Sequence, residues 1–126
     1  MKLNPSCIRA ILLTLEDKCD FNTPWEYNRY NLDSDFLADY NHAEIIYHIS
    51  QAEQSDLIKN VQYYSDGDSA LIDDLTPAGH EFLSNICCEP VWKKILEKGA
   101  NASLPILIEL AKEIAFKHFL LQYIYG

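Results

Sequence analysis

Apolar residues recur at helical spacing near the start of the chain. They follow the i, i+3, i+4, i+7 pattern that places side chains on one face of a helix: Ile8, Ile11, Leu12, Leu15 and Cys19. Asn4-Pro5 precedes this pattern and is a typical helix start. The pattern predicts a first helix that begins near Pro5 and runs to about Lys18, with one apolar face in the core.

A second helical pattern begins after Asn41. Asn41 is a good N-cap, and Glu44 stands three residues later, which gives the start a capping-box-like pattern. Apolar residues then recur on one face: Ile45, Ile46, Ile49 and Ala52. Polar and aromatic residues are expected on or near the opposite face: Tyr47, His48, Gln51 and Gln54. The pattern ends near Ser55.

A turn signal follows the second helix. Two runs of strand-forming residues, 61–65 and 69–72, flank Asp66-Gly67-Asp68. Asp-Gly between such runs favours a β-hairpin, because the turn needs positive φ and glycine accepts it. Thr76-Pro77 then starts another helix, since threonine is a good N-cap and proline at the first position lacks only an N–H that would be unsatisfied there.

The segments between these elements are shorter and less regular. Residues 21–30 are aromatic and extended, and Pro24 disfavours a helix there, so we expect a short strand that pairs with the hairpin. Residues 33–39 are expected to form a helical turn. Pro90 interrupts the helix that starts at Thr76, and residues 91–98 resume as a helix that ends at Gly99.

The order of helix, hairpin and freshly capped helix is the layout of a winged helix. We therefore predict an α+β, mostly α fold with a winged helix-turn-helix-like domain and a small antiparallel sheet. This domain is expected over residues 1–88, and residues 89–126 are expected to form a C-terminal helical extension used for packing or dimerisation.

The last predicted helix, at about residues 104–124, is apolar on nearly all sides and carries a narrow polar stripe. Such a helix is usually buried on several sides, and the charges at its centre argue against a membrane span. Either it packs lengthwise across the domain, or it pairs with a second copy. We favour a homodimer, with these contact residues: Leu107, Leu110, Ile114, Phe116, Phe119 and Leu121.

Several short motifs resemble those of a known group of proteins. They are Asn4-Pro5 through Leu13, Asp20-Phe21-Asn22, Tyr40-Asn41-His42 and Leu75-Thr76-Pro77. On these motifs the chain resembles the YjcQ-like family of uncharacterised small proteins from Gram-positive bacteria and their phages, over about residues 1–88. The resemblance implies a winged helix and a bacterial or prophage origin. It implies no activity, because the family has none assigned.

Charge is distributed unevenly along the chain. The net charge is −9, from ten basic and nineteen acidic residues. Residues 30–92 carry twelve acidic residues and one basic residue, Lys59, so this segment contributes −11 and the rest of the chain +2. A winged helix that binds DNA neutralises phosphates with lysine and arginine. We therefore do not expect ordinary duplex binding by this segment.

The second helix and the hairpin tip are the parts that would face DNA in a winged helix. Their polar residues are predicted to form an acidic partner-binding face: Glu44, His48, Gln51, Glu53, Gln54, Asp66 and Asp68. A protein with a basic surface would suit this face, and a phage or prophage inhibitor of a host nucleic-acid enzyme or defence system is one such function. The alternative is that these acidic residues form a solvated surface that binds no partner.

A DNA-binding transcription regulator remains the second function class. Its phosphate contacts would come from basic residues near the N-terminus: Lys2, Arg9, Lys18 and Arg29. Gln51 and Gln54 have the chemistry to read adenine edges. No nearby cation would anchor the DNA backbone beside these two glutamines.

The sequence indicates no enzyme, no cofactor and no metal site. Four cysteines show no Cys-x-x-Cys spacing, since Cys87 and Cys88 are adjacent. His80 and Ser84 lie one helical turn apart, but no acidic residue is placed to orient the histidine. No signal-peptide pattern is present, so we expect a cytoplasmic protein of a bacterial cell with reduced cysteines.

Overall fold

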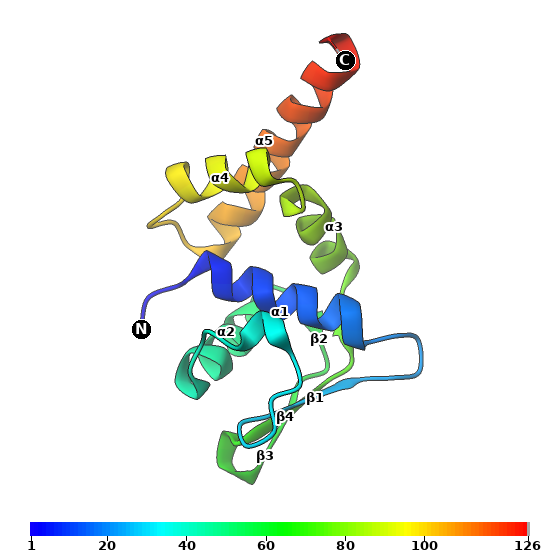
Figure 1. The fold of residues 1–126 in the computed structure, drawn as a ribbon, viewed down its shortest axis with the longest axis vertical. Helices are drawn as coiled ribbons and strands as arrows, with labels where there is room; N and C mark the ends of the chain where they lie inside the picture. Colours follow the sequence, from blue (N-terminus) through cyan, green and yellow to red (C-terminus); the bar gives the residue numbers. More distant parts are fainter. Residues whose placement is uncertain (126) are drawn as a thin grey trace.

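The computed structural model describes residues 1–125 of the chain. The helices are α1 (Pro5–Lys18), α2 (His42–Gln54), α3 (Pro77–Ile86), α4 (Glu89–Lys98) and α5 (Leu104–Tyr125), with 3-10 turns η1 (Asp35–Leu37) and η2 (Ser65–Gly67). The strands are β1 (Trp25–Asn28), β2 (Ile58–Lys59), β3 (Gln62–Tyr64), β4 (Ser69–Ile72) and β5 (Asp74–Leu75). The predicted α+β, mostly α class is confirmed. Figure 1 shows α1 between two groups, with α2 and the strands on one side and α3, α4 and α5 on the other.

Local capping defines the start of three helices. Asn4 Oδ1 accepts a hydrogen bond from the first turn of α1. Asn41 and Glu44 form the reciprocal capping box of α2, with donor–acceptor distances of 2.9 and 3.3 Å. Thr76 Oγ1 accepts from the Gly79 N–H at 2.9 Å and so caps α3. These polar groups satisfy N–H groups that have no partner inside the helix, which explains why the predicted helix starts agree with the structure.

The main sheet has three antiparallel strands in the order β1-β4-β3. Trp25 of β1 lies opposite Ile72 of β4, and Tyr64 of β3 lies opposite Ser69. The predicted hairpin is therefore present, and the strand expected in residues 21–30 pairs with its second strand. The turn is longer than predicted, because Ser65 has a left-handed φ of 54° and lies in the turn rather than in a strand.

A second, two-stranded sheet was not predicted. Ile58 of β2 pairs with Leu75 of β5, and Thr76 N–H donates to the Leu57 carbonyl at 3.0 Å. Gly79 packs directly against the same Leu57 carbonyl, so a methyl group at position 79 would overlap the backbone oxygen. This close approach joins the start of α3 to the end of α2.

One continuous hydrophobic cluster spans both predicted segments of the chain. It includes residues of α1, α2, the strands, α3, α4 and the first half of α5. The buried residues of α5 are Leu104, Leu107, Ala111, Ile114 and Ala115. Within the described residues, no helix combines the length and apolar character needed to cross a membrane.

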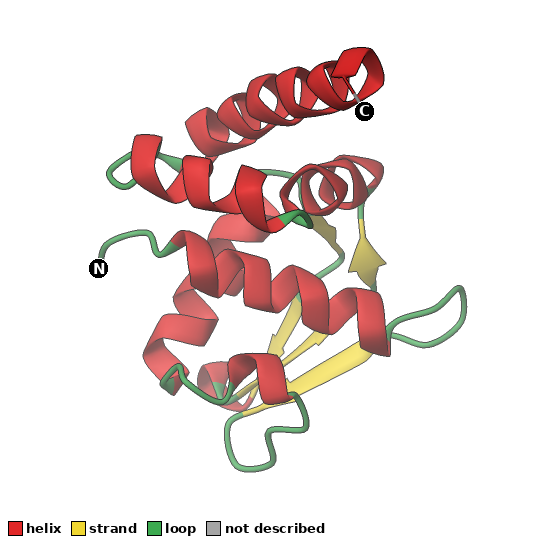
Figure 2. Ribbon diagram, turned by 45° about the horizontal axis from the view of Figure 1, so that its top comes forward, coloured by secondary structure: helices red, strands yellow, loops and turns green. Residues whose placement is uncertain are grey.

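The dimer residues predicted on the last helix fall into two groups. Leu107 and Ile114 are buried in the core of a single copy, and Leu110 is half-buried against it. Leu107 and Ile114 therefore have no surface left for the predicted contact with a second copy, because α3 and α4 already pack against α5. Figure 2 shows α5 lying over these two helices. The predicted contact of Leu110 stays a prediction. Phe116, Phe119 and Leu121 lie outside the core and are exposed.

His48 is buried, although the sequence placed it on the outer face of its helix. Its Nδ1 lies 2.7 Å from the Glu44 carbonyl oxygen, and its Nε2 lies 2.8 Å from the backbone nitrogen of Asn4. The Asn4 N–H only donates, so Nε2 is the acceptor and the proton resides on Nδ1. Burial lowers the pKa of His48, partly opposed by the Glu44 carbonyl. The neutral imidazole thus joins α2 to the start of α1.

This contact predicts that acidification weakens the fold. The pKa of an unfolded histidine is about 6.5, and the pKa in the folded chain is lower. Below about pH 6.5 the unfolded chain therefore binds a proton that the folded chain rejects, and the free energy of unfolding falls by up to ~1.4 kcal/mol per pH unit. Urea unfolding between about pH 7.5 and pH 5.5 measures this slope. The variant His48→Gln does not titrate there and is expected to show a flatter profile; equal slopes for both proteins would contradict the prediction.

Candidate functional site

The second half of α2 lies beside the hairpin and forms one outer surface with it. Glu53 of α2 accepts a hydrogen bond from the Val61 N–H at 3.1 Å, just before β3. Burial and, next, the charge of Glu53 raise the pKa of the Tyr63 phenol, and Ser50 opposes this shift. Tyr63 therefore lies against α2. We call this region the α2–hairpin surface: Ser50, Gln51, Gln54, Tyr63, Tyr64 and Asp66.

Four residues of the predicted acidic face serve the fold itself. Glu44 completes the capping box of α2, and His48 is buried. Glu53 holds the Val61 N–H. Asp68 Oδ1 forms an ion pair with Arg29 Nη1 at 3.1 Å. The structure therefore does not gather these side chains into one acidic patch that is open to a partner.

The other three predicted residues remain on the α2–hairpin surface. Gln51 is half-buried, and Gln54 and Asp66 are exposed. Gln54 Nε2 donates to Ser50 Oγ at 2.9 Å, so its amide carbonyl stays available as an acceptor. Asp66 lies in the turn with a left-handed φ of 56°, and its side chain is exposed. Asp66 is the one carboxylate of this surface, and the half-buried Glu53 lies next to the surface.

Two tyrosines are the most prominent residues of this surface. Tyr63 and Tyr64 of the edge strand are 42% and 48% exposed, whereas Trp25 and Tyr27 of β1 are buried in the core. Tyr63 and Tyr64 are not among the residues predicted for the partner-binding face. Their position on the outer strand of a hairpin with polar neighbours is the signal that distinguishes them. Tyrosine is enriched in protein interfaces because its ring is apolar and its hydroxyl forms hydrogen bonds.

Two of the basic residues considered for DNA contact are engaged within the chain. The Arg9 guanidinium lies 5.1 Å from the centre of the Trp92 ring and 3.9 Å from Glu89. Arg29 pairs with Asp68. Lys2 and Lys18 are exposed, at the start of the chain and at the end of α1. The α2–hairpin surface itself contains no lysine or arginine, so it lacks the cations that supply much of the affinity for a duplex.

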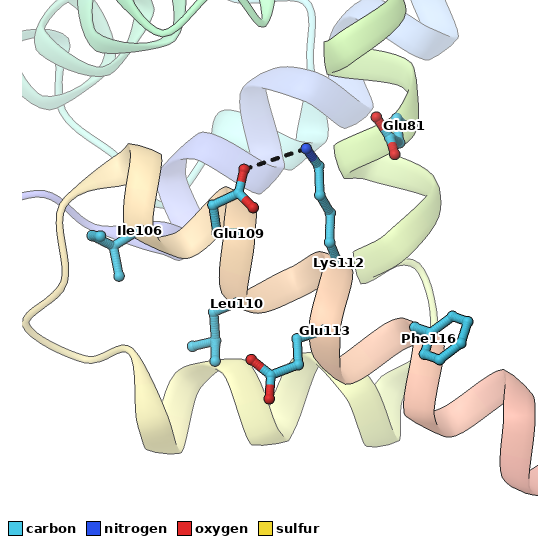
Figure 3. Close-up of a pocket in the computed structure, with 7 residues that line it drawn as sticks. All are labelled: Glu81, Ile106, Glu109, Leu110, Lys112, Glu113 and Phe116. Atoms are coloured by element: carbon cyan, nitrogen blue, oxygen red, sulfur yellow. Dashed lines mark hydrogen bonds and ion pairs between the residues drawn. The ribbon is translucent and has the colours of Figure 1, made fainter.

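A groove of about 650 Å³ runs between α3 and α5 and is shown in Figure 3. The residues that line it are Glu81, Ile106, Glu109, Leu110, Lys112, Glu113 and Phe116. Glu109 pairs with Lys112 at 3.3 Å, and Glu113 pairs with Lys117 at 3.0 Å. These ion pairs run along the surface of α5, so the charged groups do not converge on a bound small molecule.

A cysteine and a histidine from distant parts of the chain meet at the start of α4. Cys88 Sγ lies 3.5 Å from His118 Nε2 of α5, and both side chains are half-buried. The sequence analysis did not pair them, because thirty positions separate the two residues. Among the hydrogen bonds of residues 1–125, none orients the other nitrogen of His118, so the pair lacks the third member of a catalytic triad.

Metal-binding residues do not cluster in the described part of the chain. Across residues 1–125, no three histidine, cysteine, aspartate or glutamate side chains lie close enough together to hold a metal ion. The residues of the α2–hairpin surface are suited to contact rather than chemistry, since they offer ring faces, amides and a carboxylate.

Comparison with known proteins gives one match. The model of a family described as "Hypothetical protein (DUF2513)" matches residues 2–105. No curated protein and no solved structure matches the chain.

Proposed function

The chain belongs to the hypothetical-protein family DUF2513, and we propose that it is a non-enzymatic protein that acts by binding another protein through the α2–hairpin surface. The exposed tyrosines beside Asp66 carry this proposal. Their rings offer apolar contact area, and the exposed carboxylate of Asp66 favours a partner with lysine or arginine beside an apolar centre.

The proposal includes a winged-helix arrangement of the N-terminal part. The strand order β1-β4-β3 supports it, because the first strand then pairs with the second strand of the hairpin. In such an arrangement α2 takes the place of the DNA-reading helix, and the β3–β4 turn takes the place of the wing. The partner would thus bind where other winged helices bind a duplex.

A bacterial or prophage origin and a cytoplasmic location belong to the same proposal. They are supported by the resemblance to the YjcQ-like family and by four cysteines that form no disulfide. An inhibitor of a host nucleic-acid enzyme or defence protein fits this setting. Such an enzyme presents a basic cleft to its substrate, and exposed tyrosines beside the Asp66 carboxylate are complementary to that cleft.

The test is capture from a bacterial lysate with matched variants. The double variant Tyr63→Ser/Tyr64→Ser and the single variant Asp66→Lys are expected to lose a stoichiometric partner that the wild-type protein retains. Removal of contact aromatics weakens binding by about 2 kcal/mol or more, which is at least roughly thirtyfold. The control Phe21→Ser removes another exposed aromatic side chain, from the loop after α1, and is expected to retain the partner. Equal capture by all four proteins would contradict the proposal.

The alternative function, a DNA-binding transcription regulator, is supported by the same strand order and by the exposed Lys2 and Lys18. A mobility shift at low salt tests it. Retention of duplex fragments that is lost in Lys18→Glu would favour the regulator, because an interface that neutralises phosphates weakens when a cation is reversed. We expect no retention by the wild-type protein.

A further inference from the structure

The second half of α5 presents an apolar face to the solvent. Five residues there are between 44% and 89% exposed, and we call them the α5 end stripe: Phe116, Phe119, Leu120, Tyr123 and Ile124. They follow the spacing i, i+3, i+4, i+7, i+8, which places them on one side of the helix. Leu121 is also exposed, but it lies two helical turns after Ile114, on the side of the helix that carries the core residues.

This stripe cannot fold back onto its own copy. The core residues Leu107, Ala111 and Ile114 lie on the opposite side of α5. Figure 1 shows the end of the helix projecting beyond α3 and α4. All five side chains of the stripe are exposed, and Phe116, the first of them, borders the groove with α3. An apolar face of this kind on a small protein is typical of an interaction site.

The character of the outward side changes abruptly along α5. In the first half it carries ion pairs between Glu109 and Lys112 and between Glu113 and Lys117. From His118 to Gly126 the sequence contains no aspartate, glutamate, lysine or arginine. A partner that binds the stripe therefore needs an uncharged, apolar contact face of helical length.

We propose that the stripe pairs with the same stripe of a second copy, with the two helices related by a twofold axis. The three aromatic side chains are 68%, 52% and 89% exposed, so at ~200 Å² each they offer roughly 400 Å². Leu120 and Ile124 add to this area. A stable dimer buries about 600–1,000 Å² per partner, so the stripe supplies most of a small dimer interface.

The uncharged stripe is a place where a second copy can bind with little charge repulsion. Two copies of net charge −9 repel each other, and Figure 1 places the end of α5 and the β3–β4 turn at opposite ends of the molecule. Pairing through the stripe therefore keeps the two β3–β4 turns, which carry Asp66 and Asp68, far apart. A basic partner would be attracted to these turns instead. Helices that bind membrane surfaces combine an apolar face with many lysines and arginines, and the second half of α5 has none after Lys117.

The oligomeric state of the full chain tests this inference, which is independent of the partner proposed for the α2–hairpin surface. Light scattering during gel filtration, over a dilution series, is expected to show a dimer for the wild-type protein. The double variant Phe119→Ser/Tyr123→Ser is expected to raise the dissociation constant at least about 100-fold. The control Ile106→Ser removes an exposed apolar residue from the charged half of the same helix and is expected to remain a dimer.

Two outcomes would overturn the inference. One is a wild-type protein that stays monomeric up to about 100 μM, a concentration at which even a weak dimer with a micromolar constant forms. The other is a double variant that dimerises as well as the wild type.

A second variant, Tyr123→Lys, places a charge in the stripe without removing bulk. It is expected to dissociate the dimer while the circular dichroism spectrum stays unchanged. Binding of a monomeric wild-type protein to neutral phosphatidylcholine vesicles would assign the stripe to a membrane surface instead.

Discussion

Replacement of Gly79 by alanine is expected to lower the free energy of unfolding by about 3 kcal/mol, at the upper end of what overpacking costs. The added methyl group would overlap the Leu57 carbonyl oxygen. That oxygen also accepts the Thr76 N–H, so it cannot move away without breaking the hydrogen bond. α3 would have to shift as a unit, and its buried residues Phe82 and Leu83 would lose their packing.

Urea unfolding at neutral pH measures this effect. The control is Ser84→Ala on the exposed side of the same helix, where a change of less than about 0.5 kcal/mol is expected. Alanine is the better helix former, so a stabilised Gly79→Ala variant would show that α3 does not approach Leu57 this closely.

Leu107→Ala is expected to destabilise a single copy of the protein by about 3 kcal/mol, in the range found for buried leucines. Leu107 is 1% exposed and lies in the core cluster. A methyl group at Gly99 would collide with the Leu107 side chain, which shows how tightly α5 packs against the end of α4. The truncation therefore leaves a cavity that cannot close without moving two helices.

Leu121→Ala is the matched comparison on the same helix. Leu121 is 53% exposed, and its truncation is expected to change the stability of the monomer by less than about 0.5 kcal/mol. Thermal unfolding at low protein concentration separates the two variants, because a contribution from dimer formation then disappears. Equal destabilisation by both variants would mean that the two halves of α5 are buried alike.

Elements with strong local signals were predicted well from the sequence. Asn41 and Thr76 start helices at the expected positions because their caps use groups three residues away. The hairpin is also predicted correctly, because Asp66-Gly67 is a turn signal that lies within a few residues of both strands. The sheet of β2 and β5 was missed since each strand has only two residues, too few to show an alternation.

His48 fits the helical spacing of the buried residues of α2, although histidine is a polar residue. Ile45, His48, Ile49 and Ala52 follow the spacing i, i+3, i+4, i+7, and all four are buried. The polar character of histidine predicts an outer position for His48, which is wrong. Its Nε2 accepts from the Asn4 N–H, and its Nδ1–H donates to the Glu44 carbonyl. Asn4 is 44 residues away, so no local pattern indicates that this partner is present.

The candidate site was predicted less well than the fold. Asp68 pairs with Arg29 across 39 positions, and Glu53 binds the Val61 N–H. Charges counted along the sequence do not reveal such partners, so the predicted acidic face included residues that the fold already uses. The segment remains acidic overall, but its open surface is defined as much by Tyr63 and Tyr64 as by carboxylates.

The pairing of β1 with β4 has a consequence for the folding pathway. β3 and β4 are joined by a short turn, whereas Tyr27 meets Ala70 only after about 40 intervening residues have been enclosed. Closing so long a loop loses much more chain entropy than closing the hairpin. The hairpin and the capped helices are therefore expected to form early, and the arrival of β1 to limit the rate. If β1 is already docked in the transition state, substitutions in β1 that weaken the native protein slow folding. If β1 docks after the transition state, the same substitutions speed unfolding.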